Sequence, residues 1–274
     1  MGFVRANIIP IIEEHGKRPF SGRLLLLGQA DVYFSQQLLD GMAQTARVAL
    51  AEGVPTRLSH APVLAAKGYI SGDTLFRQLG FTEIAVMDIS TFEGADIQFD
   101  LNSPEIPAAL AEQFDAIIDH GTLEHVFHLP NAMRSLHRML KRGGRMIHSA
   151  PSGNFFDHGF YMFQPTLFMD FYSANHWDIN SIKVAQFTPN QETEPAFFAD
   201  YEPGLFGAVS YGGMDNKLYA TICVATKIAT STADVIPTQG TYARLNGWAA
   251  LPVGQTGKPA WRQLLDGIRG KLTS

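Results

Sequence analysis

The segment from residue 114 to residue 151 constrains the fold more than any other part of the chain. It begins with a short apolar run, FDAIID, and closes with another, RMIHS. Between them Pro130 can open a helix, and apolar residues recur at helical spacing after it. Gly143-Gly144 is expected to end that helix. Strand, helix and strand with short links predict a right-handed crossover in a parallel sheet.

Polar residues follow both of these predicted strands. Asp119, His120 and Gly121 come directly after the first, and residues 149–152 come at the end of the second. In open parallel sheets, ligands bind beyond the carboxyl ends of the strands. We therefore expect these residues to lie at the mouth of one site.

Composition narrows the classes of function and the cellular setting. The chain has 274 residues, a net charge of −5 and a single cysteine, Cys223. The acidic balance gives no sign of nucleic-acid binding, and one cysteine excludes an internal disulfide or a cysteine metal cluster. No apolar run reaches membrane-spanning length. We expect a cytoplasmic protein without nucleic-acid or membrane partners.

Five further apolar runs predict strands, which brings the expected sheet to seven. They are residues 23–28, 83–88, 96–101, 178–187 and 217–226. The main domain is expected over residues 22–226, with an inserted helical segment at 51–80 and a second insert at 188–213. For the helical segment, a scaffolding role is preferred over a lid. Residues 1–21 are expected to form a cap, and 227–274 an appendage with a helix from Trp261 to Ile268.

Two of the predicted strands end in residues that suit a nucleotide. Gly28 closes the first strand just before a helix, where backbone N–H groups can meet a cofactor, although it can equally serve only to make the turn. Asp88 closes the second, where a carboxylate can accept hydrogen bonds from a ribose diol. The alternative for Asp88 is to cap the turn at Ser90-Thr91.

Taken together, these pieces resemble the class I S-adenosylmethionine-dependent methyltransferases of the small-molecule type. The matching residues are Phe114-Asp115, Leu123-Glu124-His125 and the run Leu140-Lys141-Arg142-Gly143-Gly144. The resemblance implies a three-layer αβα sandwich with a doubly wound, Rossmann-like, seven-stranded sheet. That sheet would be mostly parallel, with its last strand antiparallel. It also implies S-adenosylmethionine as cofactor and S-adenosylhomocysteine as product.

The resemblance assigns cofactor contacts residue by residue. The methionine part would contact Gly28, Gln29 and Ala30. The ribose and adenine would contact Asp88, Ile89, Asp100 and Leu101. The sulfonium would lie near Asp119, His120 and Gly121. The family's first loop usually holds an acid and two glycines, whereas this chain has Leu26, Gly28 and Ala30. This departure keeps open an alternative, a catalytically inactive protein of the same fold used for binding or assembly. A nicotinamide oxidoreductase would need a glycine fingerprint that the chain lacks.

Histidines crowd the predicted mouth of the site. Methyl transfer to oxygen or nitrogen releases a proton, so a base helps. The first candidate is His120, and the second is His158, with Asp157 able to orient it. His125 is expected to pack behind the loop, and His148 to be a satisfied core histidine.

A metal site is the competing interpretation of this cluster. His120, Glu124, His125 and His128 supply imidazoles and a carboxylate within nine positions. Their spacing does not repeat the HExxH arrangement, and the family resembled needs no metal. We therefore expect no metal.

Aromatic residues are dense in two segments, 155–168 and 188–213. Large apolar walls with a few polar groups suit a small-molecule acceptor, organic or sugar-like. The same aromatic residues can instead fill the core or a homodimer surface.

Overall fold

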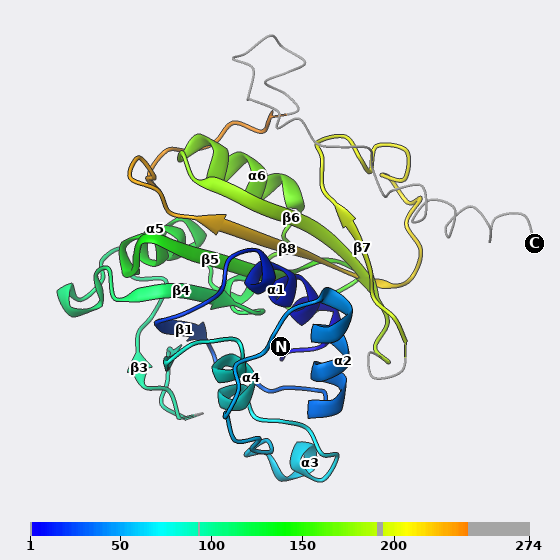
Figure 1. The fold of residues 1–274 in the computed structure, drawn as a ribbon. Coiled ribbons are helices and arrows are strands. Elements are labelled where there is room, and N and C mark those ends of the chain that lie inside the picture. The colour runs from blue at the N-terminus through cyan, green and yellow to red at the C-terminus, as the bar shows by residue number, and fades with distance from the viewer. Residues whose placement is uncertain (1, 93, 191–193, 241–274) are drawn as a thin grey trace, which may run out of the picture.

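The computed structural model describes residues 2–92, 94–190 and 194–240, in which eight strands form a single sheet (Figure 1). The strands are β1 (Arg23–Leu27), β2 (Glu83–Asp88), β3 (Ile97–Gln98), β4 (Phe114–Asp119), β5 (Leu140–Gly153), β6 (Asp178–Phe187), β7 (Phe197–Asp200) and β8 (Leu218–Thr226). The helices are α1 (Arg5–Lys17), α2 (Gln36–Ala46), α3 (Pro62–Ala65), α4 (Gly72–Gln78), α5 (Leu129–Met139) and α6 (Pro165–Ala174), with short 3-10 turns η1 (Ala108–Leu110) and η2 (Leu123–His125).

The strand order is β3-β2-β1-β4-β5-β8-β6-β7. Strands β1 to β5 pair in parallel, whereas β8 runs antiparallel between β5 and β6. The predicted doubly wound sheet with an antiparallel last strand is therefore confirmed. The eighth strand, β7, pairs antiparallel with β6 and lies inside the expected 188–213 insert. The order reverses between β1 and β4, which is where doubly wound sheets bind their ligands.

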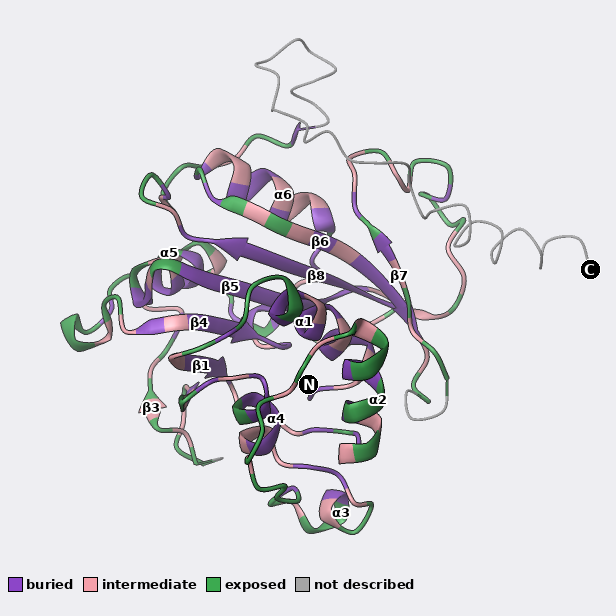
Figure 2. Cartoon of the chain, viewed as in Figure 1, coloured by how far each residue is buried: buried purple, intermediate pink, exposed green. Residues whose placement is uncertain are grey.

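The sheet is covered on both faces, as a run such as RLLLL requires. Leu24 and Leu26 pack in one core with residues of α1, α2 and α4. Leu25 and Leu27 point to the other face and pack in a second core with residues of α5 and α6. Strand residues alternate between the two faces of the sheet. Each core therefore lies between one face and the helices that cover it, which makes a three-layer sandwich. Figure 2 shows β5 and β8 buried along most of their length at the centre.

The segments flanking and interrupting the sheet contribute to the core. Ile8, Ile11 and Ile12 of α1 are fully buried, so residues 5–17 form part of a helical layer. Ile70 and Phe76 from the 51–80 segment belong to the same core, in line with a scaffolding role. The predicted helix from Trp261 to Ile268 lies outside the described residues.

Two predicted boundaries are wrong: the strand expected over residues 96–101 is only the two-residue β3 (Ile97–Gln98), and the helix expected to end at Gly143-Gly144 ends earlier. Helix α5 ends at Met139, before the Gly143-Gly144 pair, which lies inside β5 at an irregular register. Lys227 Nζ donates to His137 O (2.8 Å) and to the O of the cap residue Leu140 (2.6 Å), while the N–H groups of Glu112 and Gln113 donate to Arg138 O and Met139 O. Contacts from distant segments, including a side chain next to the end of β8, thus cap the helix where the glycines were expected to end it.

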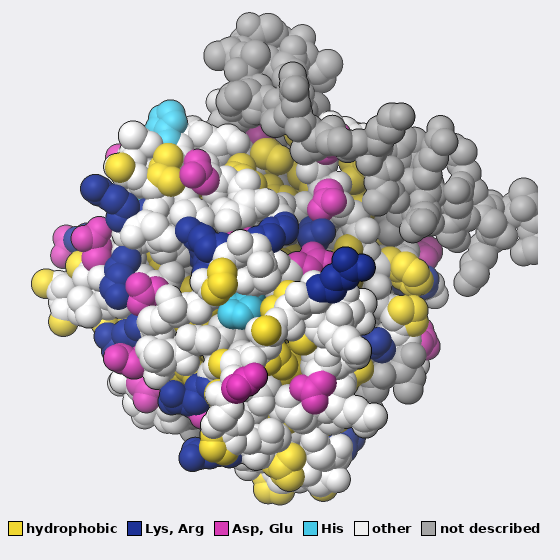
Figure 3. All heavy atoms as spheres, in the orientation of Figure 1, with side chains coloured by type: hydrophobic (Ala, Val, Ile, Leu, Met, Phe, Trp, Pro, Cys, Tyr) yellow, Lys and Arg dark blue, Asp and Glu magenta, His cyan; other side chains and the backbone are white. Residues whose placement is uncertain are grey.

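None of the described helices is both long enough and apolar enough to cross a membrane. On the face drawn in Figure 3, Lys and Arg side chains are interspersed with Asp and Glu side chains.

Candidate active site

A cleft of about 320 Å³ opens at the carboxyl ends of β1, β2 and β4. Small-molecule sites span roughly 300–1,000 Å³, so the cleft is at the small end of that range. Eight of the ten predicted cofactor residues line it: Gly28, Gln29, Asp88, Ile89, Asp100, Leu101, His120 and Gly121. Residues that were not predicted also line it, namely Leu27, Met87, Phe99, Asn102, Thr122, His125 and Val126. The first five are adjacent in sequence to predicted residues, whereas His125 and Val126 lie beyond Gly121 on the next turn.

The floor of the cleft is the backbone where β1 meets the loop after β4. Gly28 has a φ of +83°, a conformation that favours glycine, and its N–H donates to Met87 O at 2.8 Å. The Thr122 hydroxyl donates to Leu27 O at 2.6 Å. A Cβ on Gly28 would lie 3.4 Å from that hydroxyl oxygen, which is van der Waals contact, so the positive φ is what makes a side chain unfavourable here.

Asp88, the last residue of β2, and Asp100, two positions after the end of β3, are held in place by their own turns. Oδ1 of Asp88 accepts from the Ser90 N–H at 2.8 Å, as in the capping alternative. Within the described chain no hydrogen bond reaches Asp88 Oδ2, which leaves it available to a ligand diol. Oδ1 of Asp100 likewise accepts from the Asn102 backbone N–H (2.9 Å) and side-chain amide (2.8 Å). Both carboxylates are oriented without a ligand.

Two predicted cofactor residues do not line the cleft. Ala30 is buried, and Asp119 is fully buried with its carboxylate turned into the protein. Oδ2 of Asp119 lies 2.9 Å from Nδ1 of His148, whose Nε2 lies 2.6 Å from the Tyr172 hydroxyl. Oδ1 accepts from the N–H groups of Thr122 and Leu123. Asp119 therefore shapes the loop from behind, and His148 is the satisfied core histidine that was expected.

His120 reaches the cleft but is poorly suited to act as a base. Its ring is buried, stacks on Phe3 at a centroid distance of 4.6 Å, and places Nε2 3.3 Å from Gln29 O. Burial lowers the pKa of His120 to about 4. An imidazole with so low a pKa is a weak proton acceptor near neutral pH.

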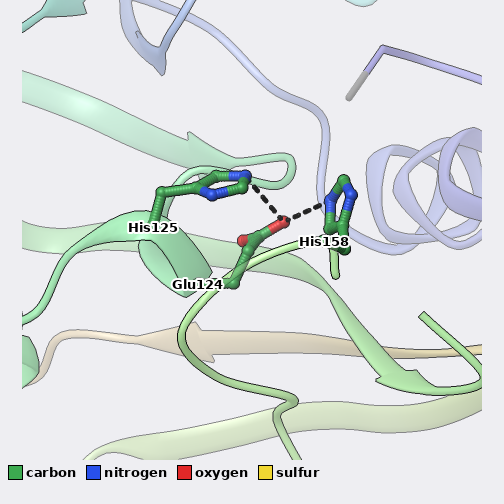
Figure 4. A group of neighbouring side chains, drawn as sticks. All are labelled: Glu124, His125 and His158. Atoms are coloured by element: carbon green, nitrogen blue, oxygen red, sulfur yellow. Dashed lines mark ion pairs between the residues drawn. The ribbon is translucent and has the colours of Figure 1, made fainter. Parts of the chain in front are cut away.

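His158 meets a carboxylate, but not the one that was predicted. Asp157 is exposed, and among the described residues no hydrogen bond or ion pair joins it to His158. Instead Oε1 of Glu124 lies 3.3 Å from Nε2 of His158 and 3.9 Å from Nε2 of His125 (Figure 4). His125 was expected to pack behind the loop; its side chain is 48% exposed and lines the cleft. It sits on the short turn η2, which points the ring outward.

The loop that carries His158 is fixed to the backbone of Glu124. The N–H groups of Phe160 (2.8 Å) and Tyr161 (3.3 Å) both donate to Glu124 O. A Cβ on Gly159 would lie 2.9 Å from the same oxygen and 3.0 Å from Glu124 Cγ, so only glycine fits without displacement. These contacts place His158 beside Glu124, although the two are 34 positions apart in sequence.

The Glu124 carboxylate is in an unfavourable environment for a lone charge. The side chain is fully buried, and neither oxygen has a hydrogen-bond partner among the described residues. Burial, reinforced by the charge of Asp119, raises the pKa of Glu124 to about 8. Burial also lowers the pKa of His125 and of His158, so both rings favour the neutral form.

Comparison with known families gives a match over part of the chain. Residues 72–192, from α4 through β6, match a family model described as a methyltransferase domain. The match and the sheet order support a class I S-adenosylmethionine-dependent methyltransferase domain in this chain. The chemistry of the cleft fits S-adenosylmethionine as the cofactor of such a domain, because Asp88 and Asp100 each present a carboxylate oxygen that accepts no hydrogen bond from the described residues.

Several solved structures match the chain at low identity. A methyltransferase from Thermotoga maritima, titled a possible histamine N-methyltransferase, is 14% identical, with a TM-score of 0.37 over 81% of this chain and 89% of that one. The YcgJ protein of Bacillus subtilis is 11% identical, with a TM-score of 0.42 over 80% and 97%. The 1,6-didemethyltoxoflavin-N1-methyltransferase of Burkholderia thailandensis is 12% identical, with a TM-score of 0.32 over 80% and 76%. No curated protein matches the sequence.

Proposed function

We propose that this chain transfers the methyl group of S-adenosylmethionine to an oxygen or nitrogen atom of a small-molecule acceptor. The observation that carries the proposal is the position of His125, which lines the cofactor cleft and also borders the Glu124–His158 pair. The cleft and this polar group are therefore contiguous. A cofactor in the first would present its methyl group toward an acceptor at the second.

Each edge of the cleft would contact a different part of the cofactor. The Asp88 carboxylate would accept from the ribose hydroxyls through its free oxygen, and Asp100 would accept from the adenine amine. The backbone at Gly28 and Gln29 would pass the methionine part, toward Gly121. These roles are supported by the hydrogen bonds that already orient both carboxylates.

The acceptor would bind at the polar cluster of Glu124, His125 and His158, which has an aromatic rim. Phe127 and Phe160 are 61% and 66% exposed and meet edge to face at 5.7 Å. The Tyr161 hydroxyl donates to Phe127 O at 2.8 Å, which ties the rim to the His158 loop. Apolar walls around a few polar groups are typical of sites for small organic molecules.

Methyl transfer from a sulfonium is an in-line displacement. The acceptor atom forms a bond to the methyl carbon, the carbon–sulfur bond breaks, and its electron pair stays on sulfur in S-adenosylhomocysteine. Holding the two reactants in line can supply roughly 7–11 kcal/mol. The acceptor's proton must also leave. Of the two histidines predicted as bases, His158 faces the acceptor side, whereas His120 is held beneath Phe3.

The proposal is tested by following a labelled methyl group. The protein is incubated with methyl-labelled S-adenosylmethionine and an extract separated into dialysable molecules, proteins and nucleic acids. We expect label to appear in the dialysable fraction together with S-adenosylhomocysteine. Asp88→Asn should strongly reduce the transfer, and His60→Ala, on an exposed loop away from the cleft, should not. Label found only in protein or nucleic acid would contradict the proposal.

A further inference from the structure

We propose that Glu124, His125 and His158 form a binding site for one divalent transition-metal ion of the Zn²⁺ type. One ligand atom from each residue lies within 4.8 Å of the other two. Figure 4 shows both imidazoles directed at the same carboxylate oxygen. This proposal replaces the expectation from sequence that the chain needs no metal, and it uses a different set of residues, without His120 or His128.

The distances suit a metal better than they suit direct hydrogen bonds. Bonds of about 2.0–2.2 Å at tetrahedral angles put neighbouring ligand atoms about 3.3–3.5 Å apart. The Glu124 Oε1 to His158 Nε2 distance is 3.3 Å, and the distance to His125 Nε2 is 3.9 Å. To bring His125 Nε2 into that range of Glu124 Oε1, the exposed His125 ring has to move by a few tenths of an ångström. The pair at 3.3 Å does not meet the geometry of a hydrogen bond, since His158 Nε2 is without a partner in the described chain.

The burial of the carboxylate is the second, independent observation. The Glu124 side chain is 0% exposed, and both of its oxygens lack hydrogen-bond partners among the described residues. A buried carboxylate without partners is costly, and it is normally paired or ligated to a metal. The nearest nitrogens belong to two imidazoles, which ligate metals in their neutral form. A cation between them would satisfy all three groups.

The ligand set indicates the class of ion and leaves room for a further ligand. Two imidazoles and one carboxylate suit Zn²⁺ and neighbouring transition metals, whereas Mg²⁺ prefers all-oxygen sites. Sites with three protein ligands keep a position open for water or substrate. Here the open side faces outward, because the side chains of His125 and His158 are 48% and 31% exposed.

The open position also defines the acceptor, an inference that rests on the proposed function. An acceptor with an oxygen donor would occupy that position at the His125 end of the cleft. Because His158 Nε2 would be bound to the ion, His158 would not act as the base; the ion would instead lower the pKa of the acceptor's hydroxyl, and the released proton would pass to solvent. The deprotonated oxygen then takes the methyl group and S-adenosylhomocysteine leaves. The acceptor class is therefore a small molecule with a hydroxyl able to ligate a metal.

The site is tested by metal binding to untagged, metal-free protein. Calorimetry and elemental analysis should give one Zn²⁺ per chain, with much weaker Mg²⁺ binding, and Co²⁺ should give the visible absorption of a low-coordinate site. Glu124→Gln and His158→Ala should each weaken Zn²⁺ binding by at least about 10-fold. His60→Ala is the matched control and should bind like the wild type. Circular dichroism establishes that each variant is folded.

S-adenosylhomocysteine binding, measured on the same samples, separates this proposal from the proposed function. We expect Glu124→Gln to keep the wild-type affinity for S-adenosylhomocysteine. Wild-type protein that binds S-adenosylhomocysteine but no stoichiometric Zn²⁺ would overturn the metal site and leave the methyltransferase assignment intact. Zn²⁺ binding that Glu124→Gln and His158→Ala both retain at full strength would also overturn it. Zn²⁺ binding without S-adenosylhomocysteine binding would contradict the proposed function alone.

Discussion

Asp119 and His148 form a buried pair behind the active site, with Asp119 Oδ2 2.9 Å from His148 Nδ1 and neither side chain exposed. The other oxygen of Asp119 accepts from the N–H groups of Thr122 and Leu123, which begin the turn that carries Glu124 and His125. The pair therefore joins strand β5 to the loop after β4. It sets the shape of the site without lining it.

Removing this carboxylate should destabilise the whole fold. Asp119→Ala leaves the His148 imidazole and two buried N–H groups without an acceptor, so we expect a loss of about 3–5 kcal/mol in the free energy of unfolding. Tyr172→Phe removes only the hydrogen bond on the far side of His148 and should cost about 1–3 kcal/mol. Urea unfolding measures both. A loss below about 1 kcal/mol for Asp119→Ala would show that the pair has no structural role.

The floor of the cleft should not tolerate a side chain. Gly28→Ala forces an L-residue into a φ of +83°, which costs about 1–2 kcal/mol, and brings its Cβ to 3.4 Å from Thr122 Oγ1. We expect lower stability and weaker S-adenosylhomocysteine binding. Gly41→Ala is the control: it lies in α2 with open space around its Cβ, and should raise stability by up to about 1 kcal/mol. Unchanged cofactor affinity in Gly28→Ala would argue against the loop as a cofactor contact.

The buried ring of His120 should make stability depend on pH. In the folded state burial lowers the pKa of His120 from 6.5 to about 4, so the native protein favours the neutral ring. As the pH falls below 6.5, His120 becomes protonated in the unfolded chain but stays neutral in the folded chain. The free energy of unfolding should therefore fall between pH 6.5 and about 4, by about 3 kcal/mol from this group.

The matched variant for this pH effect is His120→Gln, which cannot titrate. Its free energy of unfolding should decline less steeply than that of the wild type over the same interval, while the two curves run parallel above pH 7. Chemical denaturation at several pH values gives both curves. Parallel curves down to pH 4 would mean that His120 is protonated as easily in the folded chain as in the unfolded one.

The loop that carries His158 should depend on the small size of Gly159. A Cβ there would lie 2.9 Å from Glu124 O and 3.0 Å from Glu124 Cγ, so Gly159→Ala has to push the loop away. We expect Zn²⁺ affinity to fall by about 10-fold, comparable to loss of a supporting contact around a metal site. S-adenosylhomocysteine affinity should not change, because Gly159 does not line the cleft. Equal loss of both affinities would instead indicate general damage to the fold.

The strands were predictable because each is an apolar run bounded by turn residues, and the glycine or acid at each end then located the cleft. Strand β7 was missed because its four residues, FFAD, lie in a proline- and glycine-rich stretch and gain their pairing only from β6. The end of α5 was misplaced because its cap, Lys227, is 88 positions away from Met139.

The side chains of the candidate site were less predictable than the backbone that carries them. Sequence shows that Asp119 ends a strand, but not that its carboxylate turns back to meet His148. It also suggested Asp157 as the partner of His158 because the two are adjacent, whereas adjacent side chains in a loop can point apart. The contact between Glu124 and His158 depends on the path of the 153–163 loop, which no local pattern encodes.

Calorimetric titration of the wild-type protein with S-adenosylhomocysteine, with NAD as the comparison, tests the cofactor assignment in one experiment. We predict one S-adenosylhomocysteine per chain, no binding of NAD, and a loss of about 100-fold in affinity in Asp88→Asn, where about 3 kcal/mol of charge-assisted hydrogen bonding disappears. Asp40→Asn, on the exposed face of α2, should bind like the wild type. Failure to bind S-adenosylhomocysteine, or equal affinity in Asp88→Asn and the wild type, would contradict that assignment.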